Sequence, residues 1–149
     1  MSIYIHKSHN VSNLIYHIVF PVKYRLAIMD REIEVLIKKI LLEISKRYEV
    51  YFLEIGCDRD HLHLLIQTVP MKSVTEIVKM IKSITAKELY KRKPEIRKDL
   101  WGGSIWTSGY YVNTVSKNGT EGTVSNYVKN QGRDKEYRVL HKDQLKLLE

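Results

Sequence analysis

The sequence predicts an α+β domain in which a four-stranded antiparallel sheet carries two helices on one face. Four segments are rich in the β-branched and aromatic residues that are typical of strands, and two segments repeat apolar residues at the period of a helix. Their order along the chain is β-α-β-β-α-β. The length of 149 residues suits a single domain spanning 1–149, and a hydrophobic fraction of 44% is enough for a core.

The first strand is expected at 11–22, because β-branched and aromatic residues dominate this segment. Pro21 has no N–H to donate, so it should mark the end of the strand or an edge. Asp30 is a residue type that caps helices, and apolar residues then recur at helical spacing from Ile33 up to Tyr48. This segment predicts the first helix.

A hairpin is expected next in the chain. Residues 49–57 predict the second strand and His61 to Val69 the third, with a short turn at 58–60 between them. Pro70 closes the third strand. Strands separated by so short a turn pair with each other in antiparallel fashion.

The second helix is predicted to begin after Ser73, because Ser73 and Glu76 have the Ser-x-x-Glu spacing of a capping box. Its apolar stripe runs towards Arg92. Residues 104–115 predict the fourth strand. The complete order is that of the ferredoxin-like fold, which RNA-recognition domains share, so the fold is compatible with either a binding protein or an enzyme.

The ends of the chain are expected to differ from this framework. Residues 1–10 are polar and predict a mobile start, and 116–122, which contain two glycines, predict a hinge. A short appended helix fits 123–131, and 133–149 form a tail of mixed charge.

The positive charge of the chain is concentrated in one segment. The net charge is +8, and residues 72–98 contribute most of it with nine basic and three acidic side chains. A basic domain favours an anionic partner, most commonly nucleic acid, although a solvated lysine-rich helix face is the simpler alternative. A single cysteine, Cys57, excludes an internal disulfide framework and a cysteine-rich zinc site, and we expect it to be buried. No apolar run approaches the ~18 residues of a membrane helix, so an intracellular protein with no membrane partner is expected.

Two pairs of residues are candidates for chemistry. His61 and His63 alternate with apolar residues on the third strand, so both imidazoles face the same side and can chelate one divalent cation. The alternative is a pair of polar residues on a solvated strand face. Tyr127 and Gln131 are four apart on the last helix and therefore share one of its faces, where Tyr127 can serve as a nucleophile and Gln131 as an oxygen ligand. Packing is the usual role of any one of the ten tyrosines.

These two pairs together resemble a known family. His61-Leu62-His63 has the His-hydrophobe-His form of HUH endonucleases, and Tyr127 with Gln131 is similar to the Tyr-x-x-x-Gln helix of the single-tyrosine transposases of the insertion sequence 200/605 family. Three further stretches resemble the same family: YHIVFPVKYR at 16–25, DHLHLLI at 60–66 and WTSGYYVNT at 106–114. The resemblance covers nearly the whole chain.

The resemblance implies a DNA transposase and single-strand endonuclease in which Tyr127 is the nucleophile. His61, His63 and Gln131 would hold Mg²⁺ or Mn²⁺, and cleavage would pass through a 5′-phosphotyrosine. It further implies single-stranded DNA with hairpins as the substrate, and a homodimer in which the tyrosine helix is exchanged between subunits. No nucleotide cofactor is expected, and the family implies the cytoplasm of a prokaryotic cell.

Basic residues of two segments are candidates for DNA contacts: Lys79, Lys82 and Lys87 on the second helix, with Lys23 and Arg25 nearby.

Asp58 and Asp60 flank the histidine pair. A two-carboxylate metal site is one interpretation, but turn formation explains them more simply. For Asp60 alone, another interpretation is that it orients one of the two histidines. His17 is expected as a core histidine and Trp106 as a residue of the core or of a dimer interface.

Two rival functions remain compatible with the sequence. One is a non-catalytic ferredoxin-like protein that binds hairpin RNA or DNA, which would need no metal and form no covalent product. The other is a domesticated HUH endonuclease that no longer belongs to a mobile element.

Overall fold

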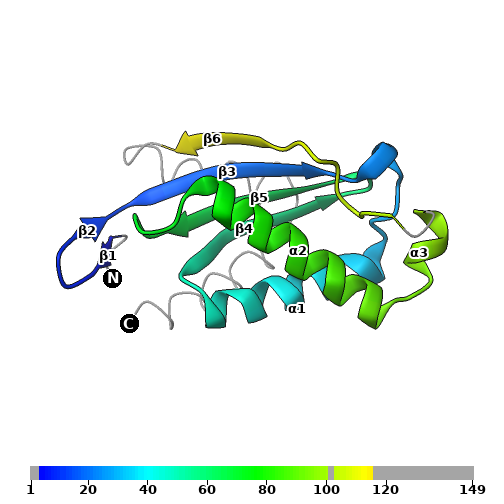
Figure 1. Cartoon of the computed structure of the whole chain (residues 1–149), viewed down its shortest axis with the longest axis horizontal. Helices are drawn as coiled ribbons and strands as arrows, with labels where there is room; N and C mark the ends of the chain where they lie inside the picture. The colour runs from blue at the N-terminus through cyan, green and yellow to red at the C-terminus, as the bar shows by residue number, and fades with distance from the viewer. Residues whose placement is uncertain (1–3, 101–102, 116–149) are drawn as a thin grey trace.

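The computed structural model of the chain describes residues 4–100 and 103–115 (Figure 1). Its main elements are β3 (Leu14–Pro21), α1 (Arg31–Arg47), β4 (Val50–Asp58), β5 (His61–Thr68), α2 (Val74–Arg92) and β6 (Tyr111–Val115). The four strands form one antiparallel sheet in the order β4-β5-β3-β6. Figure 1 shows α1 and α2 side by side in front of this sheet. The ferredoxin-like arrangement predicted from the order of elements is therefore confirmed.

Both long helices begin where their capping residues predict. The Asp30 carboxylate accepts the backbone N–H of Ile33 at 2.9 Å, which satisfies one of the free donors at the start of α1. At the start of α2, the Ser73 hydroxyl accepts the N–H of Glu76 at 3.1 Å, while the Glu76 side chain accepts the N–H of Ser73. The capping box is thus complete.

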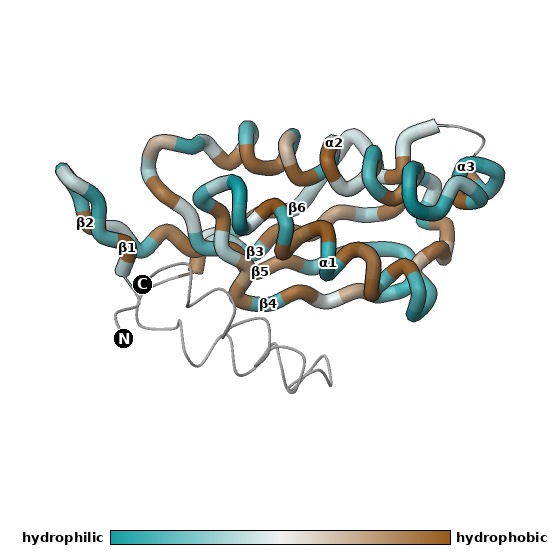
Figure 2. The backbone as a smooth tube through the Cα atoms, turned by 90° about the horizontal axis from the view of Figure 1, so that it is seen from below, coloured by the Kyte–Doolittle hydropathy of each residue, from teal (hydrophilic) through white to brown (hydrophobic). Residues whose placement is uncertain are grey.

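The core lies between the sheet and the two helices. On β5, Leu62, Leu64 and Ile66 are fully buried against this helical layer, as strand alternation predicts. In Figure 2 the hydrophobic residues gather in the strands and in α1 and α2, with hydrophilic residues around the peripheral segments. His61 and His63 alternate with the leucines, so the core packing of β5 turns both histidines to the face away from the helices.

The fourth strand is shorter than the predicted 104–115. Only Tyr111–Val115 pair with β3, and Trp106 forms an isolated bridge with Val22. The Trp106 side chain is instead part of the core, where its indole Nε1–H donates to Thr85 Oγ1 at 2.9 Å. The ammonium of Lys82 on α2 donates to the carbonyl oxygens of Thr107 and Gly109 at 2.8 and 3.0 Å. The segment before β6 thus contacts both α2 and the end of β3, where the N–H of Thr107 donates to the carbonyl of Pro21 at 3.0 Å.

The structure adds three short elements that were not predicted and divides the predicted first strand. β1 (Ile5–His6), within the start predicted to be mobile, pairs in antiparallel fashion with β2 (Val11–Ser12), and the strand expected at 11–22 is present as β2 and β3. A 3₁₀ turn, η1 (Lys23–Arg25), follows β3, and α3 (Ile96–Asp99) follows α2. The predicted hinge at 116–122, the tyrosine helix at 123–131 and the tail at 133–149 lie outside the described residues.

Cys57 is buried, as predicted. Among the described residues, no helix combines the length and the apolar character needed to span a membrane.

Candidate metal centre and basic groove

The β4–β5 hairpin brings three potential metal ligands together. Asp58 is the last residue of β4 and pairs directly with His61, the first residue of β5. Directly paired residues share a face of the sheet, and His63 shares that face because it lies two residues further along β5. Asp58, His61 and His63 therefore all face away from the helices.

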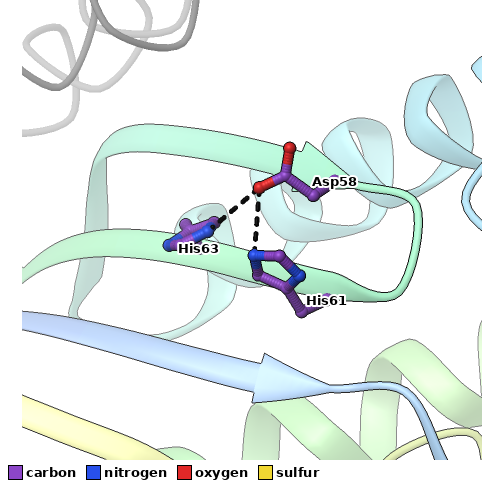
Figure 3. Close-up of side chains that lie close together, drawn as sticks. All are labelled: Asp58, His61 and His63. Atoms are coloured by element: carbon purple, nitrogen blue, oxygen red, sulfur yellow. Dashed lines mark hydrogen bonds and ion pairs between the residues drawn. The ribbon is translucent and has the colours of Figure 1, made fainter. Parts of the chain in front are cut away.

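The side chains converge on one point (Figure 3). The Nε2 atoms of His61 and His63 lie 3.0 and 3.1 Å from the same oxygen, Oδ2 of Asp58. One ligand atom from each of the three residues can be chosen so that all lie within 4.8 Å of one another. Two imidazole nitrogens with a carboxylate oxygen form a donor set that suits a divalent ion such as Mn²⁺, and the residues present fit such an ion.

The other nitrogen of each ring is also engaged. His61 Nδ1 lies 2.7 Å from Oδ1 of Asp60, and His63 Nδ1 lies 3.4 Å from Nε2 of His17, a residue of β3. A His61 ring protonated at Nδ1 donates to the Asp60 carboxylate and keeps the lone pair on Nε2 for a metal, whereas a ring protonated at Nε2 donates to Asp58. Such contacts orient metal-binding histidines and fix their tautomers.

Burial favours the neutral form of two histidines of this face, His63 and His17. The pKa of His63 is lowered by burial and by the charge of His61, and the nearby Asp58 only partly opposes this. The pKa of His17 is lowered by burial and by His63. A neutral imidazole keeps the lone pair that a metal needs, so the lowered pKa of His63 favours ligation. His17 is buried, as predicted, but it lies beside a candidate ligand rather than in the main core.

Asp60 connects this centre to the loop that follows β3. Its Oδ2 accepts a hydrogen bond from Arg25 Nε at 3.0 Å, and the hydrogen bonds from His61 and Arg25 hold the pKa of Asp60 below its usual range. Tyr24 and Arg25 have φ angles of 59° and 52°, in the left-handed region that L side chains rarely adopt. Each such residue costs of order 1–3 kcal/mol. Arg25, predicted as a DNA contact, is thus held beside the candidate metal centre.

A groove beside α2 collects several of the predicted basic residues. It has a volume of ≈ 560 Å³ and lies between α2 and residues 104–110. Lys23, Lys79 and Lys82 line it together with Trp106 and Tyr110. The groove therefore combines lysines with aromatic residues.

The three α2 lysines predicted to contact DNA differ in their surroundings. Lys79 is exposed at the groove, whereas the ammonium of Lys82 contacts two carbonyl groups and lies 5.7 and 5.5 Å from the ring centroids of Phe20 and Tyr110. Burial also lowers the pKa of Lys82. Lys87 is exposed on α2, outside the groove lining. Of the predicted α2 contacts, Lys79 is the best placed to bind an anion.

Part of the basic segment is neutralised within the fold. Arg92 forms ion pairs with Glu43 of α1 and with Glu88 at 2.8 and 3.2 Å, and Lys93 pairs with Glu32 at 2.7 Å. The charge of residues 72–98 is therefore not all available to a partner.

Sequence reasoning set Asp58 aside as a turn residue, although the signal that identifies it was present. A two-residue turn at 59–60 makes Asp58 and His61 direct partners, which places the carboxylate beside the imidazole. Tyr127 and Gln131 lie outside the described residues, so their relation to Asp58, His61 and His63 is not described.

Comparison with known proteins identifies close relatives. The family described as "Transposase IS200 like" matches residues 10–131. The ISDra2 transposase TnpA of Deinococcus radiodurans is 32% identical over 126 residues, which cover 85% of this chain and 89% of the relative. The transposase for insertion sequence element IS200 of Salmonella typhimurium is 32% identical over 124 residues, covering 83% of this chain and 80% of the relative.

Solved structures agree with these matches. A crystal structure described as a transposase from Deinococcus radiodurans R1 superposes with a TM-score of 0.69 and 28% identity, covering 85% of this chain and 96% of that one. A REP-associated tyrosine transposase bound to a REP hairpin superposes with a TM-score of 0.55 over 87% of this chain and 74% of that one. Its identity to this chain is 10%, so this likeness concerns the fold alone.

Proposed function

The chain belongs to the IS200-like transposase family, and we propose that it cleaves and rejoins single-stranded DNA at insertion-sequence ends with Tyr127 as the nucleophile. The observation that carries this proposal is the convergence of His61 Nε2 and His63 Nε2 on Asp58 Oδ2. A ligand set of this kind, two half-buried imidazoles beside an exposed carboxylate, is what metal-assisted phosphodiester chemistry requires.

In this proposal His61, His63 and Asp58 hold Mg²⁺ or Mn²⁺ together with Gln131. When bound, the cation polarises the scissile phosphodiester and stabilises the charge that develops there. His17 and Asp60 keep the two imidazole rings in the orientation and tautomer that ligation needs.

Tyr127 supplies the covalent step. The phenol has an ordinary pKa near ~10 and must lose its proton to attack. Its oxygen forms a bond to phosphorus, the bond from phosphorus to the 3′ oxygen breaks, and that oxygen takes up a proton to become a free 3′-OH. The product is a 5′-phosphotyrosine of similar energy to the bond that was broken, so a 3′-OH can later displace Tyr127 without ATP.

The substrate is proposed to be single-stranded DNA with hairpins. Lys23 and Lys79 would contact its phosphates, and Trp106 and Tyr110 add aromatic surface to the same groove. A protein of the same fold is described with a REP hairpin bound, which supports a hairpin as the recognised feature.

We also propose a homodimer in which the helix that carries Tyr127 is exchanged between subunits. β6 is an outer strand of the sheet, with β3 as its neighbour on one side. An outer strand presents backbone donors and acceptors to another chain, so β6 is the proposed site of sheet continuation. Light scattering of the purified protein should give the mass of two chains.

The experiment that tests the function is cleavage of a labelled single strand that carries an insertion-sequence end with its hairpin, in the presence of Mn²⁺ or Mg²⁺. We expect a cut strand that requires the metal, the hairpin and His61. The controls are a strand with a scrambled hairpin, a fully duplex substrate and the His61→Ala variant. Hairpin binding without any cut product would instead support the non-catalytic rival.

A further inference from the structure

The strained turn after β3 places an arginine on the carboxylate that holds His61. Arg25 Nε donates to Asp60 Oδ2 at 3.0 Å, and Asp60 Oδ1 lies 2.7 Å from His61 Nδ1. We propose that Arg25 is a positioning residue that acts through Asp60 to fix the ring orientation and tautomer of His61. This inference rests on the proposed role of His61 as a metal ligand.

Backbone hydrogen bonds join the loop and the hairpin turn into one unit. The N–H of Val22 donates to the carbonyl of Asp60 at 2.8 Å, and the N–H of Met29 donates to the carbonyl of Arg59 at 3.0 Å. The loop that carries Arg25 is therefore attached to the β4–β5 turn at both of its ends. The Asp60 carboxylate is hydrogen-bonded at both of its oxygens, and its backbone is fixed by these contacts. It therefore has little freedom to rotate.

Stability alone does not account for this arrangement. The side chains of Arg25 and Asp60 are 60% and 30% exposed, and ion pairs at such exposed positions contribute little to folding. Tyr24 and Arg25 nevertheless both occupy the left-handed region, which is unfavourable for residues other than glycine. Unfavourable backbone that persists beside a candidate site is a signature of a functional constraint. Here we assign that constraint to the hydrogen bond between Arg25 and Asp60, which this backbone brings within reach.

The test observes His61 directly in the protein without metal or DNA. Nitrogen NMR of histidine-labelled protein at about pH 8.5, well above the ordinary histidine pKa, reports which ring nitrogen carries the proton. Asp60 and Asp58 compete for the ring proton of His61 at Nδ1 and Nε2, so we expect the Nδ1 tautomer to predominate in the unchanged protein and its share to fall in Arg25→Gln. Arg25→Lys, which keeps the charge but lacks the Nε donor, should give an intermediate result.

Arg59→Gln is the matched control, because Arg59 is an exposed arginine of the same turn. It removes the same charge and should leave the His61 signals unchanged. A His61 spectrum in Arg25→Gln that matches the unchanged protein would overturn the proposal. Amide spectra would confirm that each variant is folded. If Arg25→Gln does not fold, the His61 spectrum of Arg25→Lys is compared with that of the unchanged protein instead, and identical spectra would overturn the proposal.

Metal affinity gives a second measurement. We expect Arg25→Gln to weaken Mn²⁺ binding by about tenfold or less and Arg59→Gln to leave it unchanged, since partners that orient ligands typically change affinity 10–100-fold and Arg25 acts one step further away. Equal Mn²⁺ affinity in both variants would contradict the proposal. A protein that never cleaves DNA but shows the His61 change would refute the proposed function and leave this inference standing.

Discussion

Asp58 Oδ2 lies 3.1 Å from Nε2 of His63, although the two residues belong to different strands and are not direct partners. The contact exists because Asp58 pairs with His61 at the end of the hairpin, and His63 is the next residue of β5 on that face. The carboxylate therefore reaches both imidazoles and completes a set of three donors.

The first prediction concerns this carboxylate. Asp58→Ala removes one of the three ligand atoms, so we expect Mn²⁺ affinity to fall by more than about tenfold, since even partners that only orient ligands change affinity roughly 10–100-fold. Calorimetric titration with Mn²⁺ measures this effect. Asp99→Ala is the control, because Asp99 is an exposed aspartate of α3. Equal affinity in both variants would exclude Asp58 from the site.

The second prediction separates Lys82 from the DNA contacts. Lys82→Ala leaves the carbonyls of Thr107 and Gly109 without this donor, so we expect the free energy of unfolding to fall by about 1.5–3 kcal/mol. Urea denaturation measures the loss. Lys87→Ala, an exposed lysine of the same helix, should change stability by less than about 0.5 kcal/mol. If Lys82→Ala is as stable as Lys87→Ala, the ammonium does not support the segment before β6.

The third prediction concerns Lys79. If Lys79 contacts a phosphate of single-stranded DNA, Lys79→Ala should weaken binding and lower the slope of log affinity against log salt by about 0.7. Fluorescence anisotropy at several salt concentrations gives this slope. Lys91→Ala is a suitable comparison, because Lys91 is exposed near the far end of α2 and outside the groove lining. A slope that is the same in both variants argues against a phosphate contact at Lys79.

The fourth prediction is a pH dependence of stability in the metal-free protein. The pKa values of His17 and His63 are lowered in the folded state by burial, so between those values and the ordinary 6.5 the unfolded chain binds more protons. The free energy of unfolding should therefore fall as the pH drops below about 6.5 and level off below the folded pKa values.

Denaturation of the chelator-treated protein at a series of pH values tests this dependence. His17→Asn removes one of the two histidines and should make the decline shallower. His9→Asn removes an exposed histidine and should leave the decline unchanged. An identical pH dependence in His17→Asn and in the unchanged protein would contradict the assignment.

The parts of the fold that could be predicted are those governed by local rules. Ser73 and Glu76 identify the start of α2 because a capping box involves only neighbouring residues. The shared face of His61 and His63 follows from the two-residue period of a strand, which the buried Leu62 and Leu64 enforce.

The features that escaped prediction depend on contacts between distant residues. Residues 104–110 have the composition of a strand, but the carbonyls of Thr107 and Gly109 accept hydrogen bonds from Lys82 of α2, which lies 25 and 27 residues away in sequence. Arg25 contacts Asp60 because Tyr24 and Arg25 itself adopt the left-handed conformation. Neither residue is glycine, so no sequence rule predicts this backbone. The role of Asp58 was set aside for a different reason, since turn formation explained this residue more simply than metal binding, although the same short turn pairs it with His61.

The central claim is that Tyr127 forms the covalent bond to DNA, and mass spectrometry of the protein–DNA adduct tests it most directly. After reaction with the hairpin-bearing strand and Mn²⁺, nuclease and trypsin digestion should yield the peptide of residues 118–129 carrying a nucleotide. Tyr127 is the only tyrosine of that peptide, so the modified residue is unambiguous. Tyr111→Phe, which changes an exposed tyrosine on the face of His17, should retain the adduct, and Tyr127→Phe should abolish it. An adduct on any other peptide, or one that persists in Tyr127→Phe, would contradict the account.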